Sequence, residues 1–163
     1  MATGEKLRVL VLYGGDAATH ARHELQVWLA KPSLSVEPRI VADDPPHSEG
    51  AVDDRVDAAM EWADKAIAII TPDERCEHGA PNVMDEIGRW RGMKGKRSLC
   101  ILRQDGVTPY SNHAGIVYAG FKTRVNEKFD ALREFLLDQA PPSGNASVQA
   151  AATRDLIVES NPN

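Results

Sequence analysis

Short apolar runs alternate with amphipathic helical patterns along most of the chain. Five runs are strand candidates, at residues 7–13, 35–41, 66–70, 98–102 and 116–119. Apolar residues at a spacing of three or four predict helices over 18–29, 52–63, 83–93 and 129–136. Strands that alternate with helices indicate an α/β domain, with a five-stranded parallel sheet covered by helices on both faces.

Two segments lack such a pattern. Residues 43–50, DDPPHSEG, contain two prolines and are predicted to be a long exposed loop between the second strand and the next helix. Residues 141–163 have the composition of a linker and too few apolar positions for a core. The sequence therefore predicts one domain over 1–140 and a flexible tail or linker over 141–163.

Composition and charge narrow the class of protein. At 163 residues with 42% hydrophobic residues, the chain suits a single domain with a core of its own. A net charge of -5 argues against a nucleic-acid partner, because binding to phosphates requires clustered positive charge. No apolar run approaches the roughly 20 residues that span a bilayer, and the N-terminus does not resemble a signal peptide. The two cysteines lie outside any metal-type cluster, so we expect free thiols in a reducing cytoplasm and no metal site. Because of the short apolar runs, we expect no membrane partner.

Ligands of doubly wound sheets gather at the carboxyl ends of the strands. The first such loop is Tyr13-Gly14-Gly15-Asp16, whose glycines allow a ligand to approach the backbone and whose following helix offers free N–H groups to a phosphate. Two glycines after a strand also occur in plain tight turns. The second is the 43–50 loop, for which a solvated connection is the alternative.

The third loop leads into the helix that carries Glu86. With Val83, Ile87 and Trp90 as the buried stripe, Glu86 falls at the edge of that stripe, beside an aromatic ring and near the strand ends. Position alone favours a structural interpretation, because a single glutamate in the first turn of a helix usually serves the helix dipole or pairs with a neighbour such as Arg89.

Several segments carry a family resemblance: VLVLYGGD at 9–16, IAIITPD at 67–73, NVMDEIG at 82–88 and GIVY at 115–118. Over residues 8–137 the chain resembles the bacterial TIR-like domains of CD-NTase-associated and Pycsar-type effectors, which cleave nucleotides in antiphage defence. The resemblance implies a flavodoxin-like TIR fold and aligns Glu86 with the catalytic glutamate of the family. It also implies self-association through TIR–TIR contacts and a fused or separate sensor that responds to a cyclic nucleotide or another infection signal.

On this basis the expected activity is that of an NAD+ glycohydrolase, with NAD+ as substrate and no cofactor. The residues expected to contact the substrate are Tyr13, Gly14, Gly15, Asp16, Asp43, Asp44, Gly50, Asn82 and Trp90. Tyr13 and Trp90 are stacking surfaces in this hypothesis, and core packing is the alternative for both. The 43–50 loop would be the mobile loop that completes a neighbour's site.

The chemistry of NAD+ fits a site with one convincing carboxylate. Most glycoside hydrolases need two carboxylates, because the leaving oxygen must be protonated. Nicotinamide leaves the ribosyl-pyridinium cation as a neutral molecule and needs no general acid. A single carboxylate can then stabilise the developing oxocarbenium ion. Hydrolysis to ADP-ribose and cyclisation differ only in the nucleophile that captures this ion.

Two other functions remain open from the sequence. A nucleoside deoxyribosyltransferase-like enzyme also breaks an N-glycosidic bond with a glutamate on a parallel α/β sheet, and a non-enzymatic TIR adaptor would only assemble with other TIR domains. His20 and His23 lack a third metal ligand. Cys76 and His78 do not indicate a nucleophile and base, because nothing evident in the sequence orients the histidine.

Overall fold

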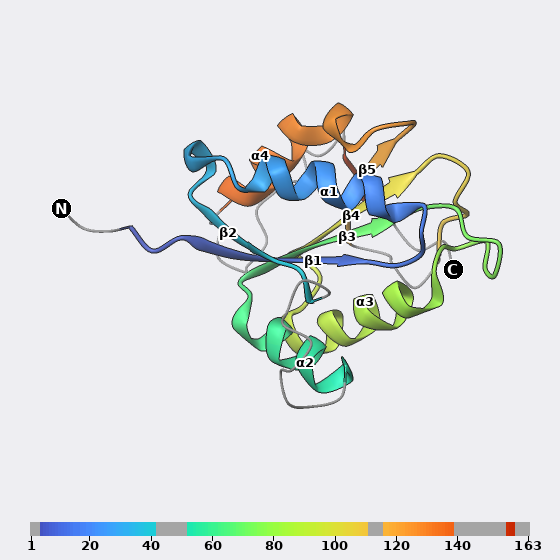
Figure 1. Ribbon diagram of the computed structural model, residues 1–163, viewed down its shortest axis with the longest axis horizontal. Helices are drawn as coiled ribbons and strands as arrows, with labels where there is room; N and C mark the ends of the chain where they lie inside the picture. The colour runs from blue at the N-terminus through green and yellow to red at the C-terminus, as the bar shows by residue number, and fades with distance from the viewer. Residues whose placement is uncertain (1–3, 42–51, 111–115, 139–155, 159–163) are drawn as a thin grey trace.

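A single twisted sheet forms the centre of the molecule, in the strand order β2-β1-β3-β4-β5-β6 (Figure 1). The computed structural model describes residues 4–41, 52–110, 116–138 and 156–158. Five strands run parallel, namely β1 (Leu7–Tyr13), β2 (Val36–Arg39), β3 (Lys65–Ile70), β4 (Leu99–Gln104) and β5 (Val117–Phe121). The predicted five-stranded parallel sheet is confirmed, and its strand order is that of a flavodoxin-like fold.

One strand was not predicted. Residues Leu156–Val158 form β6, which pairs antiparallel with β5. These three residues belong to the segment expected to be a tail, and the remainder of 141–163 lies outside the described residues. A run of three apolar residues is too short to indicate a strand without the neighbouring edge that it pairs with.

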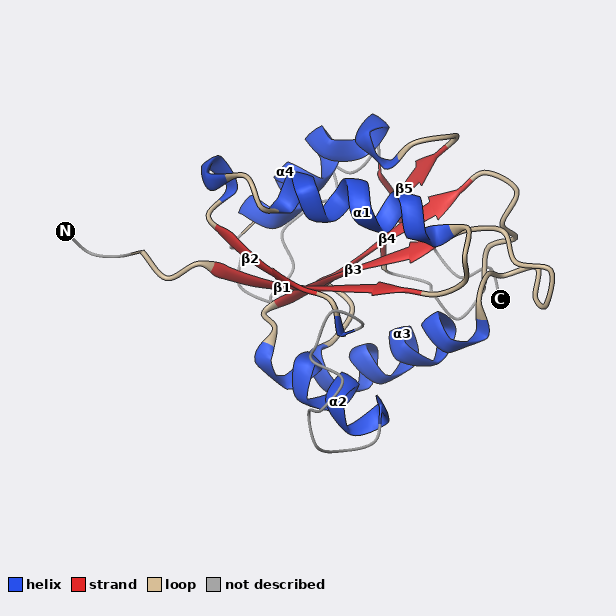
Figure 2. Cartoon of the chain, viewed as in Figure 1, coloured by secondary structure: helices blue, strands red, loops and turns tan. Residues whose placement is uncertain are grey.

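Four helices cover the two faces of the sheet (Figure 2). Helices α1 (Ala18–Leu29) and α4 (Phe129–Leu137) lie on one face, and α2 (Val52–Trp62) and α3 (Pro81–Lys94) lie on the other. Alternate residues of β1 supply both cores: Val9 and Val11 pack with α1 and α4, whereas Leu10 and Leu12 pack with α2 and α3. This alternation is the reason that β1 reads as an unbroken apolar run.

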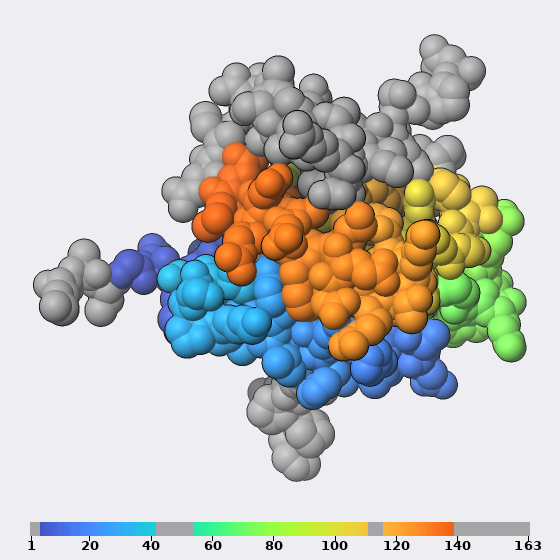
Figure 3. All heavy atoms as spheres, turned by 90° about the horizontal axis from the view of Figure 1, so that it is seen from above, coloured from blue at the N-terminus to red at the C-terminus, as the bar shows by residue number. Residues whose placement is uncertain are grey.

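The α1 and α4 face is closed by packing between distant segments. A short 3-10 helix, η4 (Val125–Lys128), leads into α4, and another, η1 (Pro32–Leu34), follows α1. The rings of Trp28 and Phe129 stack with their centroids 4.4 Å apart. Figure 3 looks onto this face and shows α1 in blue beside η4 and α4 in orange.

Helix α3 begins at Pro81, two residues before the start that the apolar stripe predicts. Proline suits the first turn of a helix because the N–H that it lacks has no partner within the helix there. Gly79 makes the turn into α3 with φ +104, and a side chain at this position would overlap Ile70 at the end of β3. The close return of the chain over β3 sets the N-terminus of α3 at the carboxyl edge of the sheet.

Candidate functional site

The turn after β1 meets the start of α3 at the carboxyl end of the sheet. Because β2 and β3 lie on opposite sides of β1, the winding direction changes there, and such a switch point is where doubly wound sheets bind ligands. Gly14 is buried at this point: a Cβ on it would overlap the side-chain oxygen of Asn82 and lie 2.9 Å from the Cβ of Ala80. The structure therefore brings together Gly14 and Asn82, two of the predicted substrate-binding residues.

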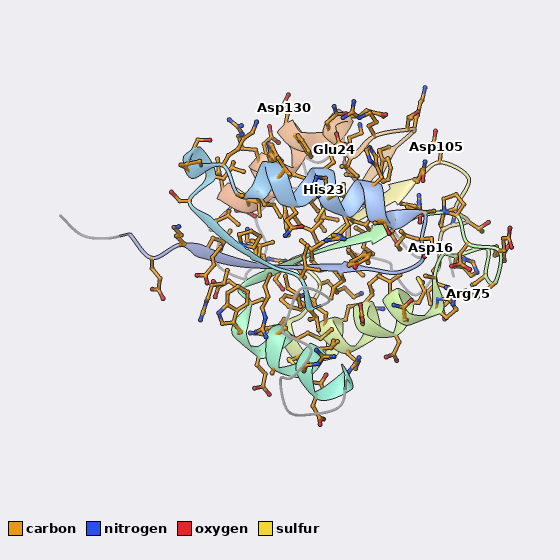
Figure 4. The ribbon with its side chains drawn as sticks, in the orientation of Figure 1. Asp16, His23, Glu24, Arg75, Asp105 and Asp130 are labelled. Carbon is orange, nitrogen blue, oxygen red and sulfur yellow. The ribbon has the colours of Figure 1, made fainter. Side chains whose placement is uncertain are left out.

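The same turn approaches the loop after β3. Gly15 has φ +82, and a Cβ on it would lie 3.2 Å from Oδ2 of Asp73. Asp16 is exposed and lies at the same edge of the molecule as Arg75 (Figure 4). Gly15 and Asp16 thus lie at the switch point, where the sequence analysis expects them.

Asp73 and Arg75 form a fixed ion pair beside this turn. The carboxylate of Asp73 accepts hydrogen bonds from the backbone N (2.8 Å), Nε (2.9 Å) and Nη2 (2.8 Å) of Arg75. These bonds lower the pKa of Asp73 to about 2. They also raise the pKa of Arg75, and the charge of Asp16 adds to that effect. The pair places two opposite charges next to the glycine turn.

Glu86 lies on α3 at the border between its buried and exposed faces. Val83, Ile87 and Trp90 are fully buried, and Glu86 is half-buried. Its spacing from these residues, three after Val83 and four before Trp90, places it at the edge of the stripe. The structure therefore places Glu86 where the sequence pattern predicts it.

Asn82, Glu86 and Arg89 share one side of α3, because they are four and three residues apart. At one end of this side Asn82 touches the Gly14 turn. At the other end Nη1 of Arg89 donates a hydrogen bond of 2.7 Å to Oδ1 of Asp57 on α2. Glu86 lies between these two contacts, on the side of α3 that faces α2.

Two carboxylates hold Arg89. Besides Asp57, Oδ2 of Asp85 lies 3.3 Å from its Nε.

Trp90 requires a correction. The sequence analysis offers it as a stacking surface for a flat ring of the substrate, but none of its surface is exposed and it packs in the core between α3 and the sheet. Its indole N–H donates to Oγ of Ser98 at 3.1 Å. With both ring faces buried and the N–H engaged, Trp90 is a core residue.

Tyr13 lies on the other side of the sheet from Glu86. Its ring packs at the margin of the core beneath α1, and the guanidinium of Arg22 lies 5.2 Å from the ring centroid. Side chains alternate along β1, so a tyrosine two residues after Val11 points towards α1. The structure does not bring Tyr13 and Glu86 to one face.

Asp43, Asp44 and Gly50 fall on a segment outside the described residues, as does the rest of the 43–50 loop. No cluster of three or more potential metal ligands is found within residues 4–41, 52–110, 116–138 and 156–158. None of the helices in these ranges is long and apolar enough to cross a membrane.

The loop between β3 and α3 contains a contact that the sequence did not indicate. The backbone N–H of Thr108 donates to the carbonyl of Glu77 at 2.9 Å, and Nδ1 of His78 lies 2.8 Å from the carbonyl of Thr108. Because a carbonyl only accepts, Nδ1 carries the hydrogen. His78 is thus oriented by a residue 30 positions away, which corrects the expectation that nothing orients it.

Asp57, Asp73 and Arg75 were not among the predicted site residues. Asp73 belongs to the TPD turn that the family resemblance includes, and this was the available signal for the ion pair. Asp57 lies on a helix rich in acidic residues, so its sequence context is that of an ordinary solvated face.

Residues 8–123 match the family model described as "CAP12/Pycsar effector protein, TIR domain". No curated protein matches the chain significantly.

Proposed function

The chain belongs to the CAP12/Pycsar effector TIR domain family, and from that premise we propose that it cleaves the bond between nicotinamide and ribose in NAD+, with Glu86 as the catalytic residue. The observation that carries the proposal is the position of Glu86, half-buried on the α2-facing side of α3 next to the switch point.

The reaction suits one carboxylate. As the C1′–N bond breaks, its electron pair leaves with the neutral nicotinamide and positive charge develops on the ribose. A carboxylate held beside C1′ stabilises that charge, and partial burial strengthens the effect because less water screens it. Water then adds to C1′ and releases one proton, which completes hydrolysis to ADP-ribose.

The residues next to Glu86 suggest how the rest of NAD+ would bind. Asn82 offers an amide one helical turn towards the strand ends, where it can hold a ribose hydroxyl. Gly14 is covered by Asn82, whereas Gly15 is exposed and has no side chain, so a pyrophosphate can approach the backbone of the turn at Gly15. Asp16 is exposed beyond them and would accept from a second ribose.

We further propose that activity depends on assembly. In this hypothesis the 43–50 loop, with Asp43, Asp44 and Gly50, completes the site of a neighbouring copy. A sensor in the same protein or a separate one would trigger that assembly on infection, and depletion of NAD+ would be the defensive effect.

The decisive experiment compares the parent chain with Glu86→Gln by chromatography of NAD+ digests at high protein concentration. The substitution keeps the size and helix propensity of the side chain and removes the charge that stabilises the ribosyl cation. We expect a loss of about 100-fold or more in rate. The melting temperature should change little, because Glu86 lies at the edge of the apolar stripe.

Three other outcomes would replace the proposal. Cleavage by the variant at the parent rate would remove Glu86 from catalysis. Transfer of the ribosyl group to added free bases, in preference to water, would indicate a transferase. Assembly of the parent without turnover of NAD+, with or without a crowding agent, would indicate an adaptor.

A further inference from the structure

Among the described residues, polar contacts join α2 to α3 beside Glu86 and at the C-terminal end of α3. Arg89 donates to Asp57 at 2.7 Å, and Nζ of Lys94 donates to the backbone carbonyl of Glu61 at 3.0 Å. We call these contacts the α2–α3 seam. Arg89 is the more buried partner of its pair, with 27% of its side chain exposed against 47% for Asp57. The hydrogen bond to Asp57 and the partial burial of Arg89 restrict the orientation of its guanidinium.

The seam lies next to Glu86 in the fold. Arg89 is three residues after Glu86 on the same helix, a spacing at which Cβ atoms are about 5 to 6 Å apart. Side chains at this spacing can approach closely enough for a cation to favour the ionised form of a neighbouring carboxyl group.

Charged side chains of both signs lie on the elements around Glu86. They are Asp85, Arg89, Arg91 and Lys94 on α3, Asp54, Arg55, Asp57 and Glu61 on α2, and Asp16 after β1. The carboxylates among them and the partial burial of Glu86 both favour its protonated form, whereas a residue that stabilises a cation must be ionised. Arg89 opposes that tendency from one turn away.

We infer that Arg89, tethered by Asp57, is a positioning residue for Glu86: it fixes the distance between α2 and α3 where Glu86 lies, and it favours the ionised form of the Glu86 carboxyl group. The catalytic part of this inference rests on the function proposed above. The electrostatic part concerns the carboxyl group alone and holds for any role of Glu86.

The test reads the protonation of Glu86 directly. Carbon-13 NMR of the glutamate side chains, with the Glu86 signal assigned by its absence from Glu86→Gln, follows the titration of this carboxyl group in the full chain. Arg89→Gln removes the favourable cation and should move the midpoint of the titration up by about half a pH unit or more. Asp57→Asn removes a like charge and leaves the cation in place, so the midpoint should move down.

The titration midpoint of Glu86 should thus move in opposite directions in Arg89→Gln and Asp57→Asn. A purely structural role of this ion pair would not produce opposite shifts. The matched control is Arg8→Gln, which breaks the Arg8–Asp64 pair at the start of β1, with side chains 38% and 39% exposed. It should lower the melting temperature and leave the Glu86 titration unchanged. If Arg89→Gln behaves like this control, the inference is wrong.

Two additional measurements complete the design. Arg89→Lys keeps the positive charge but loses the planar guanidinium with its several N–H donors. It should therefore preserve the titration midpoint of Glu86, while kcat for NAD+ falls more than KM changes. If Arg89→Gln does not fold, Asp57→Asn and Arg89→Lys decide, and an unmoved midpoint in Asp57→Asn overturns the inference. Full activity in Glu86→Gln would contradict the proposed function and the catalytic part of this inference, and would leave its electrostatic part standing. An inactive Glu86→Gln with no titration shift in the seam variants would contradict this inference alone.

Discussion

In the part of the chain that the structure describes, hydrogen bonds within local turns strongly lower the pKa values of Asp73 and Glu127. Asp73 is held by Arg75, and its pKa falls to about 2. Glu127 accepts hydrogen bonds from three successive backbone N–H groups, those of Lys122 (3.0 Å), Thr123 (3.0 Å) and Arg124 (2.9 Å). These bonds lower the pKa of Glu127 to about 2 as well. Asp73 lies in the loop between β3 and α3, and Glu127 lies within η4, directly before α4.

The lowered pKa of Glu127 predicts a pH-dependent contribution to stability. A folded-state pKa below the unfolded value of 4.5 means that the stabilisation is present above about pH 4.5 and is lost as the pH falls towards about 2. Glu127→Gln should therefore lower the melting temperature at neutral pH, and the gap to the parent should close on acidification. Thermal melts from pH 7 to 2 measure this, with the exposed Glu134→Gln on α4 as control. A gap that stays constant with pH would refute the assignment of the three hydrogen bonds.

At the scale of elements, α3 combines a buried stripe, a polar side towards α2 and an exposed side with two glycines. Gly88 and Gly92 lie within the helix, and a Cβ at either would have no heavy atom of another segment within 4 Å. Gly14 differs, because a Cβ there would overlap Asn82. Gly14 thus allows Asn82 to approach the backbone at the switch point. On the outer side of α3, packing would allow a larger residue than glycine at positions 88 and 92.

This contrast predicts opposite effects of the same substitution. Gly88→Ala should raise the free energy of unfolding by about 0.5 to 1 kcal/mol, because alanine loses less backbone entropy than glycine in a helix. Gly14→Ala should lower it, because Asn82 and the start of α3 must move. Urea unfolding of both variants tests the pair, and a Gly14→Ala variant as stable as the parent would contradict the packing at the switch point. If Asn82 holds the substrate, Gly14→Ala should also raise KM for NAD+.

At the scale of the whole molecule, the site lies between layers that come from separate parts of the chain. The turn after β1 and the loop before α3 lie at the N-terminal end of α3, and the α2–α3 seam lies further along the same helix (Figure 1).

The proposed assembly predicts a concentration dependence. The specific activity of the parent towards NAD+ should be low in dilute solution and rise with protein concentration, because each site would need a neighbour to complete it. Turnover measured over a wide concentration range, together with light scattering, provides the test. A specific activity that stays constant while the protein remains monomeric would remove assembly from the mechanism.

The elements of the fold, and the place of Glu86 on one of them, follow from the sequence by itself. Alternation of apolar runs with helical stripes predicts the parallel sheet, and three buried positions on α3 predict a half-buried Glu86, since both patterns depend on neighbours a few residues apart. Tertiary structure decided the rest of the site. It set the side of α3 that faces α2 through a pair 32 residues apart, Asp57 and Arg89. It buried Trp90, turned Tyr13 towards α1 and closed Gly14 on Asn82. These outcomes depend on contacts between segments that are far apart in the sequence. The spacing of apolar residues within one segment does not predict such contacts.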